Sequence, residues 1–194
     1  RGLGDVYKRQ PDNRLSSLNL DPIVKLALEE DLVRSDMTTN ILVTSNSTTS
    51  ANIIAKESLT LAGIPILEKT FELLDSSVTI KAHRIDGETV QAGETIASLQ
   101  GSTRSILAGE RAALNFLQHL SGIATLTREA VQCVSHTDTK ILDTRKTSPG
   151  LRIAERYAVR TGGGINHRFN LNAGILVKDN HIKALKGVGF GMGD

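Results

Sequence analysis

A strand, a helix and a second strand follow one another between residues 140 and 178, and this order constrains the fold more than any other feature. Lys140–Thr144 and Gly174–Lys178 are short apolar runs typical of strands, whereas Leu151–Arg160 has helical spacing. Two strands joined through a helix pair in parallel, because a crossover connection brings the second strand back in the same direction. The sequence therefore predicts a βαβ unit, from which parallel sheets and barrels are built.

The preceding residues follow a different pattern, in which helices alternate with short strands. Helical spacing predicts one helix from Asp21, taken as its N-cap, to Glu30, and another that starts at Gly63. Arg34–Thr39 reads as a polar turn, and short runs from Val78 to Gly101 predict small β-hairpins. Residues 20–104 are therefore expected to form one α+β domain with a partly antiparallel sheet.

The longest helical stretch, Ser105–His136, opens the second predicted domain, residues 105–194. Gly122, next to Ser121, is expected to kink this stretch or to divide it into two helices. Residues 1–19 lack an initiator Met and an apolar segment, and we interpret them as a foreign or disordered leader. The second domain looks unfinished at residue 194, so the natural chain is expected to continue.

Composition excludes several classes of protein. A net charge of +2 and 3% aromatic residues do not favour a nucleic-acid partner, which needs concentrated basic residues or stacking surfaces. Cys133 is the single cysteine, so it cannot form an intramolecular disulfide, and a reducing, cytoplasmic compartment is expected. No apolar run reaches the roughly 18 residues of a membrane span.

The chemistry is expected at the carboxyl ends of the two strands predicted between residues 140 and 178, where ligands gather in parallel α/β folds. Between Asp143 and His181 the chain has seven Lys and Arg residues but only three Asp and Glu residues. The polar residues Asp143–Gly150 lie at and after the end of the first strand, and Lys178–His181 lie at and after the end of the second. The excess of cations predicts a small anionic ligand.

Other features have simpler interpretations. Arg152, Arg156 and Arg160 recur at every fourth position and are interpreted as a solvated helix face. His119 is expected on a helix surface or at an interface, and Cys133 is expected to be a buried thiol. Lipoyl and biotinyl carrier domains share the Gly-marked strands of residues 78–101, but no lysine stands at a hairpin tip here.

The sequence resembles the quinolinate phosphoribosyltransferase family over residues 20 to 183. The matching segments occur in the family's order: Glu30-Asp31 with Asp36–Thr39, Gly109–Gln118, Leu120–Thr125, Asp143–Gly150, Gly162–Arg168 and Lys178–His181. The resemblance implies an α/β fold class, in which an N-terminal α+β sandwich precedes an incomplete, TIM-like α/β barrel. It also implies a homodimer in which each active site is completed by the neighbouring subunit.

The family's reaction joins quinolinate to 5-phosphoribosyl 1-diphosphate with Mg²⁺, giving nicotinate mononucleotide, CO₂ and diphosphate for NAD synthesis. The resemblance implies Lys146 and Lys178 as catalytic residues and, apart from Arg111, places the substrate-binding residues at the predicted strand ends. Arg111 is expected to reach the partner subunit's site. The implied substrate-binding set is Arg111, Thr144, Arg145, Lys146, His167, Arg168 and Lys178. The Mg²⁺ ligands are expected beyond this chain.

Two departures from the family's pattern and two alternative functions remain open. Ala173 stands where many bacterial members have an acidic residue, and Ser148 replaces a usual threonine. One alternative is the related pyridine-type phosphoribosyltransferase of the molybdate-transport type. The other is an anion-binding fragment without activity, because an incomplete barrel leaves strand edges uncovered.

Overall fold

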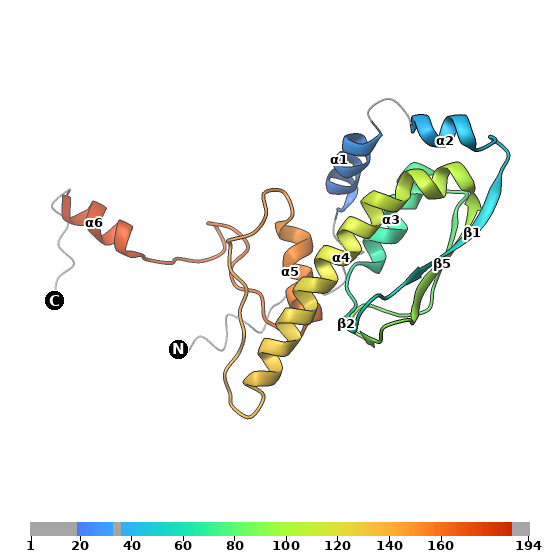
Figure 1. Ribbon diagram of the computed structural model, residues 1–194. Coiled ribbons are helices and arrows are strands. Elements are labelled where there is room, and N and C mark those ends of the chain that lie inside the picture. Colours follow the sequence, from blue (N-terminus) through green and yellow to red (C-terminus); the bar gives the residue numbers. More distant parts are fainter. Residues whose placement is uncertain (1–18, 33–35, 188–194) are drawn as a thin grey trace.

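The computed structural model describes residues 19–32 and 36–187 and has a mixed α/β fold, as predicted (Figure 1). The elements, in chain order, are α1 (Asp21–Asp31), α2 (Met37–Leu42), β1 (Thr48–Ile54), β2 (Leu59–Thr60), α3 (Ile64–Leu74), β3 (Thr79–Ala82), β4 (Thr89–Val90), β5 (Thr95–Ser102), α4 (Thr103–Cys133), α5 (Arg152–Thr161) and α6 (Asp179–Gly187). The expected leader lies, apart from Asn19, outside the described residues.

The predicted helices form, with small differences at their ends. Helix α1 begins at Asp21 itself, so the N-cap is Leu20 rather than Asp21. Part of the predicted polar turn is helical, since Asp36 caps α2 by accepting a hydrogen bond from the Thr39 N–H at 2.9 Å. Helix α4 is unbroken through Gly122, because it is packed along its length and one internal glycine costs only about 1 kcal/mol.

The sheet is antiparallel, with the strand order β1-β5-β3, and α3 and α4 lie against it (Figure 1). The hairpins predicted within Val78–Gly101 do not form, because β3 pairs with β5 and β4 pairs with β2. Asp86 explains this pairing: its carboxylate accepts the N–H groups of Gly63 and Ile64 at the start of α3. This contact draws the segment before β4 toward α3 and β2.

Two apolar clusters share α3 and α4. One lies between these helices and the sheet and includes Leu67, Phe71 and Leu99. The other joins them to α1 and α5 through residues such as Val24, Leu120 and Tyr157. Helix α5, which follows the first predicted strand of the βαβ unit, is therefore anchored to the N-terminal half of the molecule.

The predicted βαβ unit is incomplete. Residues 140–144 make a single parallel bridge, between Leu142 and Ile165, and the predicted strand Gly174–Lys178 does not form. Ile175 is 97% exposed, and this segment has no neighbouring strand within the described residues. Without a neighbour, the N–H and C=O groups of an extended segment cannot form a ladder. None of the described helices combines the length and apolar composition of a membrane span.

Helices α3 and α4 approach closely at Gly109, which gives a test of this packing. An added Cβ there would lie 2.7 Å from Cε1 of the buried Phe71. We expect Gly109→Ala to lower the free energy of unfolding by about 1–2 kcal/mol, because overpacking outweighs the gain in helix propensity. Urea denaturation measures this change.

The matched control is Gly122→Ala in the same helix, where a Cβ meets nothing within 4 Å. This variant should raise the free energy of unfolding by about 0.5–1 kcal/mol. Equal stabilisation by both substitutions would contradict the described packing of α3 on α4.

Candidate functional site: two cationic segments held by a buried carboxylate

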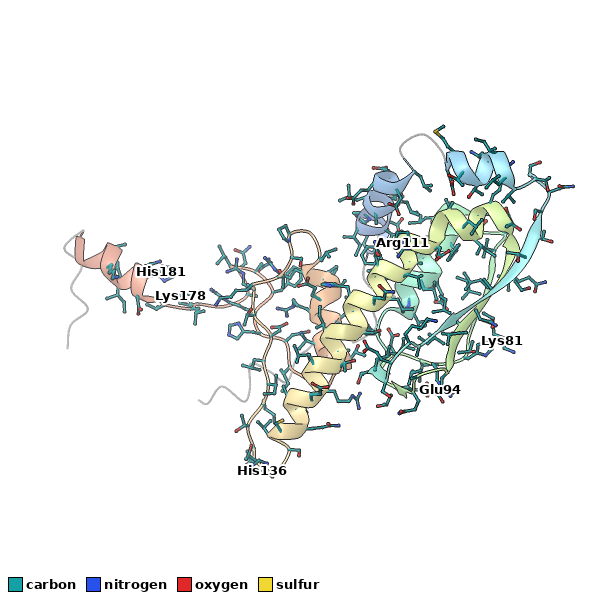
Figure 2. The ribbon with its side chains drawn as sticks, in the orientation of Figure 1. Lys81, Glu94, Arg111, His136, Lys178 and His181 are labelled. Carbon is teal, nitrogen blue, oxygen red and sulfur yellow. The ribbon has the colours of Figure 1, made fainter. Side chains whose placement is uncertain are left out.

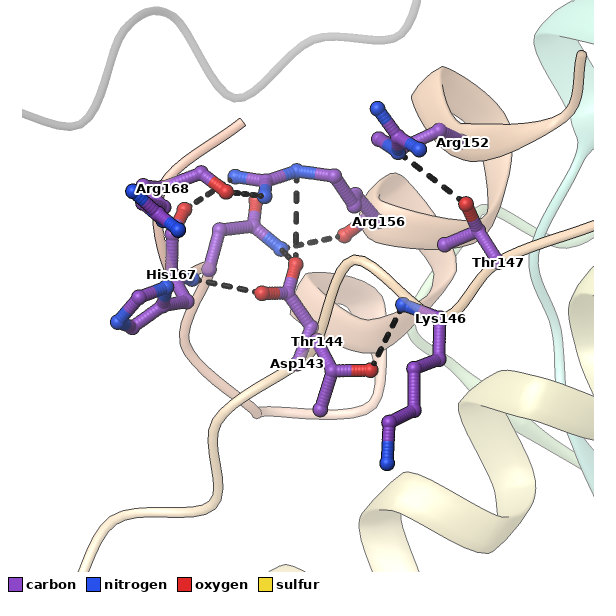
Figure 3. A network of polar contacts seen from close by, with 9 residues as sticks. Asp143, Thr144, Lys146, Thr147, Arg152, Arg156, His167 and Arg168 are labelled. Carbon is purple, nitrogen blue, oxygen red and sulfur yellow. Dashed lines mark hydrogen bonds and ion pairs between the residues drawn. The ribbon is translucent and has the colours of Figure 1, made fainter. Parts of the chain in front are cut away.

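Two segments predicted to carry the chemistry lie side by side, although helix α5 stands between them in the sequence. The Leu142–Ile165 bridge aligns them: the Asp143 N–H donates to the Ile165 carbonyl at 3.0 Å, and the Ile165 N–H donates to the Ile141 carbonyl at 2.8 Å. The segment Thr144–Lys146 follows this bridge on one side, and His167-Arg168 follows it on the other (Figure 3).

Asp143 lies at the centre of this arrangement, with a side chain that is 4% exposed. Its Oδ1 accepts the His167 N–H at 2.7 Å, and its Oδ2 accepts the Asn166 side-chain amide at 2.6 Å. The Nε of Arg156 lies 3.4 Å from Oδ2 and completes a buried ion pair (Figure 3). Both oxygens of Asp143 are therefore used within the molecule.

Arg156 holds the same segment from α5. Its guanidinium donates to the carbonyls of His167 at 2.7 Å and Arg168 at 3.1 Å and lies 5.2 Å from the centre of the Phe169 ring. Burial lowers the pKa of Arg156, and the adjacent Asp143 opposes this shift. The predicted solvated face was therefore wrong for Arg156, which is buried beneath the site.

The other two arginines of α5 are half-buried rather than fully solvated. The Nε of Arg152 donates to the Thr147 hydroxyl at 3.2 Å. Burial lowers the pKa of Arg160. Helical periodicity identified residues that share a face, but it did not show which neighbour covers that face.

Glu155 secures the segment that follows Thr144–Lys146. Its carboxylate accepts the Ser148 N–H at 3.2–3.3 Å and contacts the His119 Nε2 at 3.0 Å, with 11% of the Glu155 side chain exposed. Burial raises the pKa of Glu155, but the hydrogen bonds from Ser148 and His119 outweigh it and hold the pKa below its usual value. His119 thus lies at the contact between α4 and α5, consistent with the predicted interface position.

The structure brings four of the predicted substrate-binding residues to this place, Thr144, Lys146, His167 and Arg168, and Arg145 lies between Thr144 and Lys146 in the chain. The Thr144 hydroxyl accepts the Lys146 N–H at 3.0 Å, which shapes the turn between them. Arg145 is half-buried, and its Nε has no hydrogen-bond partner among the described residues. Arg168 donates to the Gly174 carbonyl at 2.8 Å.

Two predicted residues lie elsewhere. Lys178 is exposed just before α6, which lies apart from α5 in Figures 1 and 2, and its N–H donates to the His181 Nδ1 at 2.9 Å. Arg111 lies on an exposed face of α4 (Figure 2). The prediction that Cys133 is buried was wrong. Its thiol is exposed at the last residue of α4, beyond the part of this helix that packs on α5.

Asp143, Glu155 and Arg156 were not identified as site residues by sequence reasoning. For Asp143 a signal existed, since it directly precedes Thr144-Arg145-Lys146 at a predicted strand end. For Glu155 and Arg156 the spacing alone carried no such signal. Among residues 19–32 and 36–187, no group of three or more His, Cys, Asp or Glu side chains is arranged to hold a metal ion.

Comparison with known proteins gives matches over most of the chain. The family model for the quinolinate phosphoribosyl transferase N-terminal domain matches residues 36–121, and the model for the C-terminal domain matches residues 123–190. A Bacillus subtilis relative named "Probable nicotinate-nucleotide pyrophosphorylase [carboxylating]" is 46% identical over 170 residues, which is 88% of this chain and 58% of the relative.

A further relative and a solved structure also match most of this chain. A chloroplastic Arabidopsis thaliana protein, "Nicotinate-nucleotide pyrophosphorylase [carboxylating]", is 39% identical over 88% of this chain and 49% of its own length. The crystal structure of NadC from Streptococcus pyogenes matches with a TM-score of 0.85 and 43% identity, covering 89% of this chain and 61% of that one. The chain therefore spans about half to three fifths of the length of these relatives.

The contacts of Glu155 predict a pH-dependent stability. Because the folded pKa lies below the ordinary value of 4.5, this carboxylate stabilises the protein above pH 4.5 and loses its effect as the pH falls through the folded pKa. We expect Glu155→Gln to lower the free energy of unfolding at pH 7 by about 1–2 kcal/mol. Denaturant titrations between pH 7 and pH 3 should show the gap to wild type narrowing below pH 4.5.

Glu129→Gln is the control, since Glu129 is exposed on α4 and has no side-chain hydrogen bond or ion pair among the described residues. It should change the stability little at any pH. A deficit of Glu155→Gln that stays constant down to pH 3 would argue against a role for the ionised carboxylate.

Proposed function

The chain belongs to the quinolinate phosphoribosyltransferase family, and we propose that it supplies the quinolinate-binding part of a carboxylating nicotinate-nucleotide diphosphorylase. This pentosyltransferase would join quinolinate to 5-phosphoribosyl 1-diphosphate and release CO₂ and diphosphate, giving nicotinate mononucleotide for de novo NAD biosynthesis. The observation that carries this proposal is the meeting of Thr144–Lys146 with His167-Arg168.

The charges of the site favour a dianion. The nearby carboxylates of Asp143 and Glu155 are already engaged by Arg156 and by Ser148 and His119. By contrast, no ion pair involves the side chains of Arg145, Lys146, His167 or Arg168 within the described residues. Quinolinate carries two carboxylates on a planar ring, and guanidinium groups match planar carboxylates with paired hydrogen bonds.

The residues would act mainly by holding and neutralising the substrate. In the proposed reaction, the bond between ribose C1 and the diphosphate oxygen breaks, and the quinolinate nitrogen bonds to C1. The resulting pyridinium accepts the electron pair left when the carboxylate beside the nitrogen departs as CO₂, and a proton then replaces that carboxylate. We assign Lys146 as a catalytic lysine near both substrates. Lys178 is proposed as the second catalytic lysine, and it would join the site only when the segment 174–178 pairs as a strand of the complete barrel.

Mg²⁺ is proposed only as the companion of 5-phosphoribosyl 1-diphosphate. Mg²⁺ is commonly bound through substrate phosphates, waters and one or two carboxylates. The described residues have no cluster that fits the ion by itself, so no step is assigned to it.

We propose a homodimer, in which Arg111 completes the partner subunit's site. Arg111 is exposed on α4 and takes no part in the hydrogen bonds and ion pair of the Asp143 network within the described residues. A cytoplasmic location is also proposed, because the exposed thiol of Cys133 persists best in a reducing compartment. The molybdate-transport type of transferase is not favoured, since the family models and the named relatives are quinolinate enzymes.

The reaction is tested with the protein expressed from its complete reading frame. We expect this protein to release labelled CO₂ from carboxyl-labelled quinolinate when 5-phosphoribosyl 1-diphosphate and Mg²⁺ are present. Turnover of nicotinate or another base without release of CO₂ would contradict the proposed function. Quinolinate binding without any turnover would favour the anion-binding alternative.

The residue assignment is tested by isothermal titration of quinolinate into the same protein. Arg145→Ala and Arg168→Ala should each weaken binding about tenfold or more, since each removes a charged hydrogen-bond donor. Lys81→Ala removes an exposed charge from β3 in the N-terminal sheet, which makes no contact with the Asp143 network among the described residues, and should leave the Kd unchanged. Undiminished binding by both arginine variants would overturn the assignment.

A further inference from the structure

We propose that Asp143 is a positioning residue of the quinolinate site, because its carboxylate locks the His167-Arg168 segment to the Thr144–Lys146 segment. This contact fixes the backbones that carry the cations of the two segments relative to each other. The inference rests on the proposed function for the identity of the ligand, whereas the lock itself is defined by the contacts of Asp143 and Arg156.

Both oxygens of Asp143 are directed at the other segment. The backbone of Asp143 leads directly into Thr144, while its Oδ1 accepts the His167 N–H at 2.7 Å and its Oδ2 accepts the Asn166 amide at 2.6 Å. A residue of one segment thus fixes the backbone of the other. Since the side chain is only 4% exposed, water does not compete effectively for these contacts.

Arg156 adds a second set of contacts to the lock. It provides the counter-charge of Asp143 at 3.4 Å and also donates to the carbonyls of His167 and Arg168. The Asn166 amide in turn donates to the Arg156 carbonyl at 2.9 Å. The backbone that carries His167 and Arg168 is therefore held by α5 as well as by Asp143 (Figure 3).

Such a lock is needed because the site gathers like charges. Arg145, Lys146 and Arg168 carry like charges, and the nearby carboxylates of Asp143 and Glu155 are already engaged by other groups. Without the lock, only the Leu142–Ile165 bridge would join the two segments, and a ligand would have to order the residues beyond it at the expense of binding free energy. The lock therefore acts on affinity through the cations and does not itself need to touch the ligand.

The test compares Asp143→Asn with Asp138→Asn in the protein expressed from its complete reading frame. The amide introduced by Asp143→Asn keeps one acceptor oxygen, but it places an NH2 donor against either the His167 N–H or the Asn166 amide and removes the charge that pairs with Arg156. Asp138, by contrast, is exposed and has no hydrogen bond or ion pair among the described residues. By titration calorimetry we expect Asp143→Asn to raise the Kd for quinolinate about tenfold or more, with an unchanged number of sites per chain. Asp138→Asn should bind like wild type.

A purely structural role predicts a different pattern. Partial unfolding lowers the number of sites and leaves the Kd of the remaining folded protein unchanged. Hydrogen exchange gives a local readout without ligand: the His167 amide should lose its protection in Asp143→Asn, while the amides of α4 keep theirs.

If Asp143→Asn does not fold, Arg156→Lys is the variant that tests the positioning role. Lysine keeps the counter-charge of Asp143 but cannot reproduce the planar fork that binds both carbonyls. We expect folded protein with a Kd raised about threefold or more and with a less protected Arg168 segment.

The outcomes separate the two proposals. If wild type binds no quinolinate, the proposed function is wrong, and the inference that rests on it falls as well. If wild type binds and both Asp143→Asn and Arg156→Lys bind within twofold of it, the proposed function stands and the positioning role is overturned. The positioning role is also overturned if Asp143→Asn does not fold and Arg156→Lys binds within twofold of wild type.

Discussion

The buried ion pair between Asp143 and Arg156 is the contact on which the site depends. Removing one partner of such a pair leaves an uncompensated charge in the interior, which costs about 3–5 kcal/mol. Here the pair also organises backbone, since Asp143 and Arg156 together hold His167 and Arg168 through three hydrogen bonds to main-chain groups. The position of the cations therefore follows from two side chains that are hidden beneath them.

Helix α5 connects this pair to the rest of the molecule through three consecutive residues. Glu155 holds Ser148 and His119, Arg156 holds the His167 segment, and the Tyr157 hydroxyl donates to Asp86 at 2.7 Å. Asp86 also caps α3, although burial raises the pKa of this carboxyl against the effect of its hydrogen bonds, and burial raises the pKa of Tyr157. The site is thus fixed relative to the N-terminal half by one short helix.

The sequence predicted the parts of this structure that local patterns determine. Helices α1, α3, α4 and α5 follow from apolar spacing, and the polar segments after Leu142 follow from the ligand-binding rule for parallel strands. The pairing of β4 with β2 was missed because strands of two residues are too short to show an alternating pattern in the sequence. Their position depends instead on the contact of Asp86 with the start of α3. The burial of Arg156 was missed because its partner Asp143 is 13 positions away in the chain, beyond the reach of any helical period.

The crystal structure of the full-length protein with quinolinate tests the central claim most directly. We expect the two carboxylates of the ligand to contact cations from both segments, with Arg145 or Lys146 on one side and His167 or Arg168 on the other. We also expect the Asp143 carboxylate to remain bonded to the His167 N–H. Quinolinate bound at another place, or bound through one segment while Asp143 has released the other, would contradict this claim.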